Sequence, residues 1–192
     1  LKEAQATGYP REKMYGVWWS GAEPDVKDVG MGAKGYNAVT MQHGAEPNSA
    51  VVKEIMDKVH GKGQGTGPKE ELGSVLYMRG AMSAMMAIEG VRSAQDRFGK
   101  GKVMTGEQVR WGLENLALDQ KKLDALGFAG VMRPISTSCA DHRGATWARG
   151  QIVGTVSFDE IVFPQGEKKV PKERWEQIFA ATKVLEQKPY LR

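Results

Sequence analysis

Cys139, Asp141 and His142 place a thiol, a carboxylate and an imidazole within one short polar segment. Such groups could activate a thiolate nucleophile, which needs a base that a third group holds in place. Neighbours in a turn rarely reach one another with that geometry, because the partners in such sites are normally adjacent in space rather than in the chain. We therefore interpret residues 138–144 as a polar hairpin turn in which Asp141 accepts backbone N–H bonds and Cys139 packs inward. No catalytic residue is predicted.

Metal and phosphate sites find little support in the sequence. The chain has one cysteine and three histidines, His43, His60 and His142, whereas a protein zinc site needs three or four ligands. The glycine-dense stretch 61–68 lacks the GxxxxGK[ST] spacing of a phosphate-binding loop, and no strand is expected before it. We expect neither a metal nor a cofactor, and we interpret residues 61–68 as a flexible connection.

Trp18, Trp19, Tyr77 and Arg79 could together bind an organic anion. Aromatic rings offer apolar area to bury, and the planar guanidinium pairs with a carboxylate. Two adjacent tryptophans at the end of a strand cannot both point into one core, because strand side chains alternate between faces. One of them is therefore expected to face outward. On the residues alone, this binding role and a structural one, with both tryptophans in the core and Arg79 solvated, are equally open.

Length and charge restrict the classes of partner. The 192 residues suffice for one large domain or two small lobes, and 41% hydrophobic and 26% charged residues are typical of a globular protein. The net charge of +4 is spread along the chain, so we predict no nucleic-acid partner. A single cysteine fits the cytoplasm and also the bacterial periplasm. No apolar run approaches the roughly 18 residues of a membrane span.

The first 41 residues predict an alternation of helix and strand. Residues 1–6 read as the end of a helix that begins before Leu1. Residues 13–19 are expected to form a short strand, followed by a small-residue turn and a helix over 23–29 with Pro24 in its first turn. Residues 35–41 predict a second strand. Such alternation is typical of a mostly parallel sheet with covered faces, where ligands bind beyond the carboxyl ends of the strands.

Helices dominate the middle of the chain. Pro47 opens a helix whose apolar residues fall at helical spacing, namely Val52, Ile55, Met56 and Val59. Residues 69–97 predict a long, methionine-rich and mostly buried helix. A capping box at Thr105 and Gln108 opens a further helix, and residues 119–126 predict another. Strands over 151–153 and 157–162 and a helix over 171–188 complete the expected elements.

The order of these segments resembles the substrate-binding proteins of branched-chain amino acid ABC transporters. The resemblance rests on Tyr15-Gly16-Val17-Trp18-Trp19, Gly35-Tyr36-Asn37-Ala38-Val39, Pro47-Asn48, Leu76-Tyr77-Met78-Arg79-Gly80, Ala87-Ile88-Glu89 and Thr105-Gly106-Glu107-Gln108-Val109-Arg110. The stretch from Ser138 to Gly144 is similar to a subset of that family suspected of taking ligands other than the aliphatic amino acids.

The resemblance implies a type I periplasmic-binding-protein-like α/β fold. Its two three-layer lobes with parallel sheets are joined by hinge strands and close on a small ligand. Members are close to twice this length, so the chain would be about the C-terminal half. Residues 1–41 would complete the second lobe, 42–131 would return as helices of the first lobe, and 132–192 would supply hinge strands and C-terminal elements. The N-terminal half of the same protein would be a partner.

The resemblance also implies a ligand site in the cleft. Trp18, Trp19 and Ser20 would line it from one lobe, and Gly73, Tyr77 and Arg79 from the other. In amino-acid-binding members, a glutamate at the position matched to Trp18 pairs with the α-ammonium group of the ligand. An indole cannot form that ion pair, although it can offer a cation–π face. A less cationic ligand, such as an aromatic or other organic carboxylate, is therefore expected.

By this resemblance, the function would be that of a non-catalytic solute-binding component of an ABC uptake system. It would deliver an amino acid-like or organic carboxylate ligand to a membrane permease, and it would lie in the periplasm or be lipid-anchored outside the cytoplasm. The alternative is a ligand-sensing receptor domain of the same fold, whose closure another partner detects. A third hypothesis is an enzyme that uses Cys139 and His142.

Overall fold

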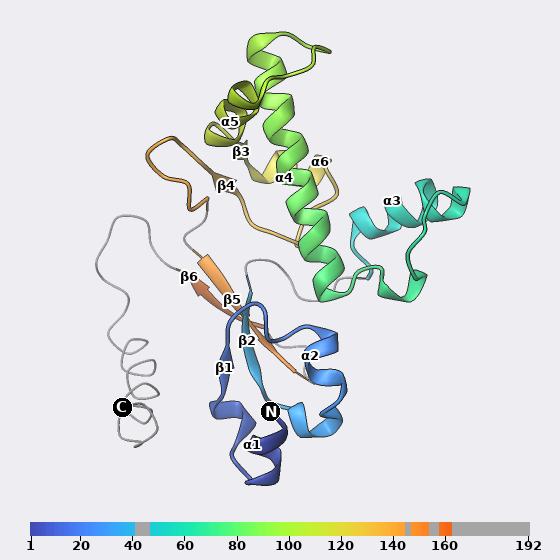
Figure 1. Cartoon of the computed structure of the whole chain (residues 1–192), viewed down its shortest axis with the longest axis vertical. Helices are drawn as coiled ribbons and strands as arrows, with labels where there is room; N and C mark the ends of the chain where they lie inside the picture. Colours follow the sequence, from blue (N-terminus) through green and yellow to red (C-terminus); the bar gives the residue numbers. More distant parts are fainter. Residues whose placement is uncertain (41–46, 145–146, 154–157, 163–192) are drawn as a thin grey trace.

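The computed structural model describes residues 1–40, 47–144, 147–153 and 158–162. Figure 1 shows two groups of elements, which we name the sheet unit (residues 1–40, 147–153 and 158–162) and the helical unit (residues 47–144). The elements in chain order are α1 (Lys2–Ala6), β1 (Tyr15–Gly16), α2 (Glu23–Lys27), β2 (Asn37–Thr40), α3 (Ala50–Lys58), α4 (Val75–Phe98), α5 (Gly106–Glu114), β3 (Ala117–Leu118), α6 (Gln120–Ala125), β4 (Ile135–Ser136), β5 (Trp147–Ile152) and β6 (Phe158–Val162). Short 3-10 turns cover Arg11–Lys13, Gly30–Ala33, His60–Lys62 and Lys69–Glu71.

The sheet unit is built on four strands in the order β1-β2-β5-β6. The predicted parallel pairing of the first two strands is confirmed, with Tyr15 opposite Asn37. β5 runs antiparallel to β2, and β6 runs antiparallel to β5, so the sheet is mixed. Along β2, Ala38 and Thr40 are buried while Asn37 and Val39 are half-buried, as alternation between two faces requires. In the helical unit, β3 and β4 form a separate antiparallel pair.

The predicted strand over residues 13–19 is wrong in length, because β1 ends at Gly16. The backbone N–H of Ser20 donates to the carbonyl of Val17 (3.0 Å), which turns the chain immediately after the strand. A Cβ at Gly16 would lie 1.7 Å from the hydroxyl of Tyr36. Only glycine therefore allows β1 to approach this tyrosine so closely, and the two tryptophans lie in the turn rather than in the strand.

The predicted long helix is confirmed over 75–97, but its expected start at Lys69 is wrong. Residues 69–71 form a 3-10 turn, and the backbone of Gly73 then enters the left-handed region with a φ of +83°. Ser74 caps α4, since its Oγ accepts the backbone N–H of Tyr77 at 3.3 Å. Helical propensity over 69–74 is thus overridden by a glycine that leaves the helical conformation and a serine that satisfies a free N–H.

The core of the helical unit forms where α3, α4 and α6 meet. The predicted stripe of α3 is confirmed in that Val52 is buried and Ile55 and Met56 pack against the core. The buried cluster consists of Val52, Leu72, Met78, Met82, Met85, Leu116, Leu118, Leu123, Phe128, Val131 and Met132. The predicted capping box is also confirmed, with Thr105 and Gln108 exchanging hydrogen bonds of 2.9 and 3.3 Å. The predicted helix over 171–188 lies outside the described residues.

α4 and α5 pack against each other through two glycines. A Cβ at Gly112 would lie 1.9 Å from the carbonyl oxygen of Gly90 and 3.0 Å from the backbone nitrogen of Ala94. The two helix backbones can approach this closely because neither position carries a side chain. Within the described residues, no helix combines the length and the apolar character that crossing a membrane requires.

Glu89 is the buried charge of the helical unit, with 1% of its surface exposed. Its carboxylate accepts from Arg92 Nη1 at 2.6 Å, one turn further along α4, and pairs with Lys122 Nζ of α6 at 2.7 Å. Both cations keep part of their surface in solvent. Because a buried carboxylate without partners is costly, these two contacts allow Glu89 to lie inside the unit and tie α4 to α6.

Gly112→Ala should destabilise the protein, and Gly80→Ala should not. An added methyl at Gly112 meets the backbone of α4, and overpacking of this kind costs roughly 1–3 kcal/mol. A Cβ at Gly80, inside α4, meets nothing within 4 Å, so alanine there should stabilise by roughly 0.5–1 kcal/mol through helix propensity. Equilibrium urea unfolding measures both values. Equal effects of the two substitutions would contradict the close helix contact.

Glu89→Gln should lower the free energy of unfolding by roughly 1–3 kcal/mol, because hydrogen bonds to charged partners are lost. The matched control is Glu54→Gln in α3, which breaks an exposed pair of Glu54 and Lys58 at 3.3 Å. Exposed i,i+4 pairs contribute only about 0.3–0.5 kcal/mol. Urea unfolding at neutral pH compares the two variants. If Glu54→Gln cost as much as Glu89→Gln, the ion pairs of Glu89 would have no special structural role.

Candidate functional site

Trp18 and Trp19 lie in the turn between β1 and α2, outside the core. Their ring centroids are 5.3 Å apart with an interplanar angle of 67°, an edge-to-face arrangement. Trp18 is 37% exposed and Trp19 is 71% exposed. The structural reading with both indoles in the core is therefore wrong, because the strand ends before it reaches them. We name this exposed pair the tryptophan lip.

A buried tyrosine and a serine hold the backbone of the lip. The hydroxyl of Ser20 donates to the carbonyl of Val17 at 2.8 Å and lies 2.8 Å from the hydroxyl of Tyr36. Tyr36 itself is only 6% exposed. A Cβ at Gly21 would lie 2.2 Å from the Cβ of Ala38, so the end of the turn packs directly on β2. The indoles are thus exposed on a turn that the sheet supports.

The first turns of α4 meet this lip from the helical unit. The guanidinium of Arg79 donates a hydrogen bond from Nη2 to the carbonyl oxygen of Trp18. Next to it, both carboxylate oxygens of Glu23 in α2 accept the backbone N–H of Val75, at 3.0 and 3.1 Å. Figure 1 shows that the beginning of α4 lies close to α2. These contacts join segments that are 61 and 52 residues apart in the chain.

Sequence reasoning did not identify Glu23 or Tyr36 as part of this region. An acidic residue in the first turn of a helix is fully explained by the dipole of its own helix. The contact of Glu23 with α4 joins residues far apart in the chain, so no local sequence pattern predicts it. The β-forming character of Tyr36 indicated a strand, but not that its hydroxyl would reach the turn after another strand.

The other two predicted site residues lie at the same end of α4 but differ in surroundings. Gly73 is buried and precedes the N-cap of the helix. Tyr77 packs against the core cluster and lines an apolar groove, and burial raises the pKa of its phenol. Since positions two apart on a helix point about 200° from each other, Tyr77 and Arg79 lie on opposite sides of α4. The assignment of all six residues to a ligand site stays a prediction.

The groove beside Tyr77 has a volume of about 540 Å³ and runs along one face of α4. Its lining is mostly apolar and comes from α3, α4 and the segment after α6; it consists of Val51, Ile55, Tyr77, Gly80, Ala81, Ala84, Met85, Ile88, Glu89, Arg92, Leu126 and Phe128. Ile88 is 53% exposed although it is apolar. The predicted long helix is therefore less buried than its many apolar residues indicated.

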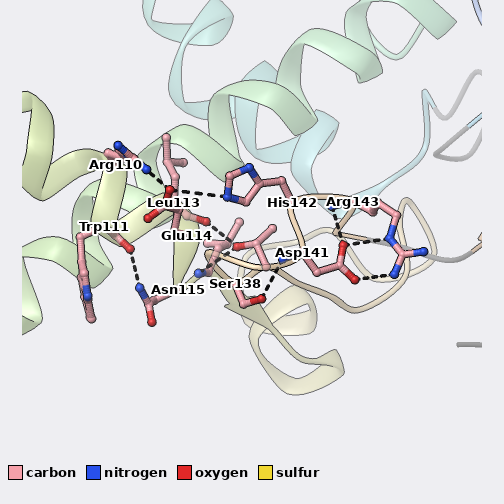
Figure 2. Close-up of polar contacts among 11 residues, drawn as sticks. Arg110, Trp111, Leu113, Glu114, Asn115, Ser138, Asp141, His142 and Arg143 are labelled. Atoms are coloured by element: carbon pink, nitrogen blue, oxygen red, sulfur yellow. Dashed lines mark hydrogen bonds and ion pairs between the residues drawn. The ribbon is translucent and has the colours of Figure 1, made fainter. Parts of the chain in front are cut away.

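The turn around Cys139 is polar, as predicted, and its charged side chains pair with residues other than the thiol (Figure 2). Asp141 accepts from the backbone N–H of Arg143 at 3.0 Å and from its guanidinium at 2.6 and 2.9 Å, which holds the pKa of Asp141 well below its usual range. His142 Nε2 lies 3.5 Å from the carboxylate of Glu114. The expectation that Cys139 packs inward is wrong, because the thiol is exposed.

Among the residues that the structure describes, no three or more histidine, cysteine, aspartate or glutamate side chains gather closely enough to hold a metal ion. The clustered charges around Glu114 and Asp141 are balanced by arginines, and Glu114 raises the pKa of Arg110 above its ordinary value.

Comparison with solved structures finds the same fold in two longer proteins. One is described as an ABC transporter permease from the Pseudomonas fluorescens group, with a TM-score of 0.75 and 29% sequence identity over 97% of this chain. The other is a branched-chain amino acid ABC transporter protein from Thermus thermophilus with bound valine, with a TM-score of 0.60 and 24% identity over 93% of the chain. The chain spans 44% of the length of each. Among curated proteins, none is similar enough to count as a relative.

The family model described as "Periplasmic binding protein" matches residues 1–151. This match covers the larger part of the chain, including the tryptophan lip, Glu23 and the whole of α4. The fold predicted from the resemblance, a partial type I periplasmic-binding-protein fold, is confirmed. The chain belongs to the periplasmic binding protein family.

Proposed function

We propose that the chain is part of the solute-binding component of an ABC uptake system. It binds a small organic ligand, either amino acid-like or an aromatic or other organic carboxylate, in a cleft that hinge closure seals between two lobes. The protein lies in the periplasm or is lipid-anchored outside the cytoplasm, and it delivers the ligand to a permease in the membrane. Its role is binding rather than turnover.

The tryptophan lip is the observation that carries this proposal. Trp18 and Trp19 are exposed although two indoles have much apolar area to bury, and Tyr15 and Val17 beside them are exposed as well. Exposed apolar patches on proteins commonly mark ligand-binding or interaction sites. The periplasmic binding protein family model covers this segment. We therefore propose a small solute as the partner of this surface.

We also propose that the N-terminal half of the same protein completes the cleft. The chain spans 44% of each similar structure, and the apolar groove along α4 leaves Ile88 exposed. Both observations support a longer protein in which further polypeptide packs on the helical unit. Residues 1–41, 42–131 and 132–192 then keep their predicted roles as the end of the second lobe, the returning helices and the hinge segment.

Trp19→Ala should weaken ligand binding by roughly tenfold or more, because each 1.4 kcal/mol of lost contact is tenfold in affinity and aromatic anchors often contribute more than that. The ligand is found first by thermal shift of the full-length protein against amino acids, aromatic acids and amides. A ligand that binds only the folded state raises the midpoint as its concentration rises above Kd. Calorimetric titration then compares wild type with Trp19→Ala.

Met31→Ala is the matched control, because Met31 is also apolar and 80% exposed in the sheet unit but belongs to the 3-10 turn Gly30–Ala33, which follows α2 in the chain and contacts α1. It should leave the affinity unchanged. If no compound raised the midpoint of the wild type, the solute-binding function would be rejected. If Met31→Ala weakened binding as much as Trp19→Ala, the lip would not be the contact surface.

The permease distinguishes uptake from sensing. The ligand-loaded protein should stimulate ATP hydrolysis by its permease complex reconstituted in vesicles, and the unloaded protein should stimulate it less. A protein that binds its ligand tightly but leaves this ATPase unchanged would be a ligand-sensing receptor domain instead.

Cys139→Ser with His142→Ala should bind the ligand as the wild type does, because neither residue belongs to the lip.

A further inference from the structure

We infer that Glu23 and Arg79 form a two-point clasp that joins the sheet unit to α4 and fixes the tryptophan lip. Both are positioning residues that act through the backbone of the other unit. The inference rests on the proposed function only in giving the lip its role as a ligand contact. The clasp itself follows from hydrogen bonds within the chain.

The first point of the clasp is the start of α4. The N–H groups in the first turn of a helix have no partner within that helix. In α4 the first of them, at position N1, is the N–H of Val75. Both oxygens of Glu23 accept it, at 3.0 and 3.1 Å. Ser74 satisfies a different N–H, that of Tyr77, so the serine and the glutamate cap α4 together. A carboxylate is well suited to this position, because the helix dipole adds to the hydrogen bond.

The second point is one turn further along the same helix. Arg79 follows Val75 by four residues, and positions four apart lie on one face of a helix. Helical side chains lean toward the N-terminus of their helix, which brings the Arg79 guanidinium toward the end that Glu23 caps. There it donates to the carbonyl oxygen of Trp18. The bond holds the backbone from which the first indole of the lip projects.

The two hydrogen-bonding contacts lie at the two ends of one short segment of the sheet unit. Trp18 and Glu23 are five residues apart, separated by the turn that Ser20 and Gly21 anchor on Tyr36 and Ala38. A charged hydrogen bond at each end of this segment therefore fixes it against α4. The Nη2 group of Arg79, which the resemblance placed among ligand contacts, already donates to the backbone of Trp18. We thus assign to Arg79 the orientation of the lip rather than direct pairing with a ligand carboxylate.

A double-mutant cycle tests the first point. Val75→Pro removes the N–H that Glu23 accepts while keeping a residue that N1 of a helix tolerates, and Ser74 already has the extended conformation (ψ 163°) that a following proline favours. In the full-length protein, Glu23→Ala should lower the folding equilibrium constant by roughly fivefold or more, as loss of a helix cap does. In the Val75→Pro background, Glu23→Ala should have little further effect. An undiminished effect would overturn the first point.

Two variants separate the hydrogen bond from charge alone. Glu23→Gln keeps an acceptor oxygen at the same reach and should rescue part of the loss seen with Glu23→Ala. Glu71→Gln removes a negative charge from the 3-10 turn just before α4 without breaking a hydrogen bond to the sheet unit. It should therefore reduce stability less than Glu23→Ala does. If Glu71→Gln cost as much as Glu23→Ala, the effect would be that of the helix dipole, and the clasp would be rejected.

A spectroscopic signature tests the second point. Two indoles held 5.3 Å apart at a fixed angle give an exciton couplet in far-ultraviolet circular dichroism, and Trp19→Phe identifies it by abolishing it. Arg79→Met should remove or strongly reduce the couplet in a protein that is still folded, whereas Arg79→Lys should keep part of it. An unchanged couplet in Arg79→Met would overturn the second point. These measurements need no ligand, so a failure of the ligand screen and a failure of the clasp are distinguishable.

Discussion

α4 begins at Val75, directly after a glycine and a capping serine. Gly73 leaves the helical conformation and Ser74 caps the helix, so the direction of every side chain along α4 is set from this point. A start at Lys69 would have continued one helix through the glycine and left no free N–H for Glu23. The observed start turns Met78, Met82 and Met85 toward the core and brings Arg79 to the sheet unit.

Strong local signals in the sequence predicted much of the fold. Spacing at i, i+3, i+4 and i+7 identified α3, and a reciprocal cap identified α5. The resemblance identified the family from the order of short segments, although no single motif is diagnostic. What failed were boundaries, such as the end of β1 at Gly16, after which the bond from Ser20 to Val17 turns the chain, and the start of α4 after Gly73, whose backbone leaves the helical conformation.

The candidate site was predicted only in part, because its most important contacts are non-local. The sequence indicated that an indole would face outward, since neighbouring strand residues alternate; the structure exposes both, because they follow the strand rather than end it. Nothing in the sequence singled out Glu23, and Arg79 was open to either an anion-binding or a solvated role. Hydrogen bonds that join segments 52 and 61 residues apart depend on how the two units meet, and no window of local sequence contains that information.

The same contacts bear on the charge that a ligand can carry. Glu23 is the carboxylate nearest in sequence to the lip, and both its oxygens accept the N–H of Val75. A ligand ammonium group that recruited Glu23 would have to uncap α4, at a cost of roughly 0.5–2 kcal/mol, whereas the indole faces of the lip offer a cation only the weaker cation–π attraction. Apolar and aromatic surface on the ligand meets no such penalty. Under the proposed function, the lip therefore selects for the ring or carbon skeleton of a ligand, and recognition of any ammonium group falls to residues outside the segment from Trp18 to Glu23.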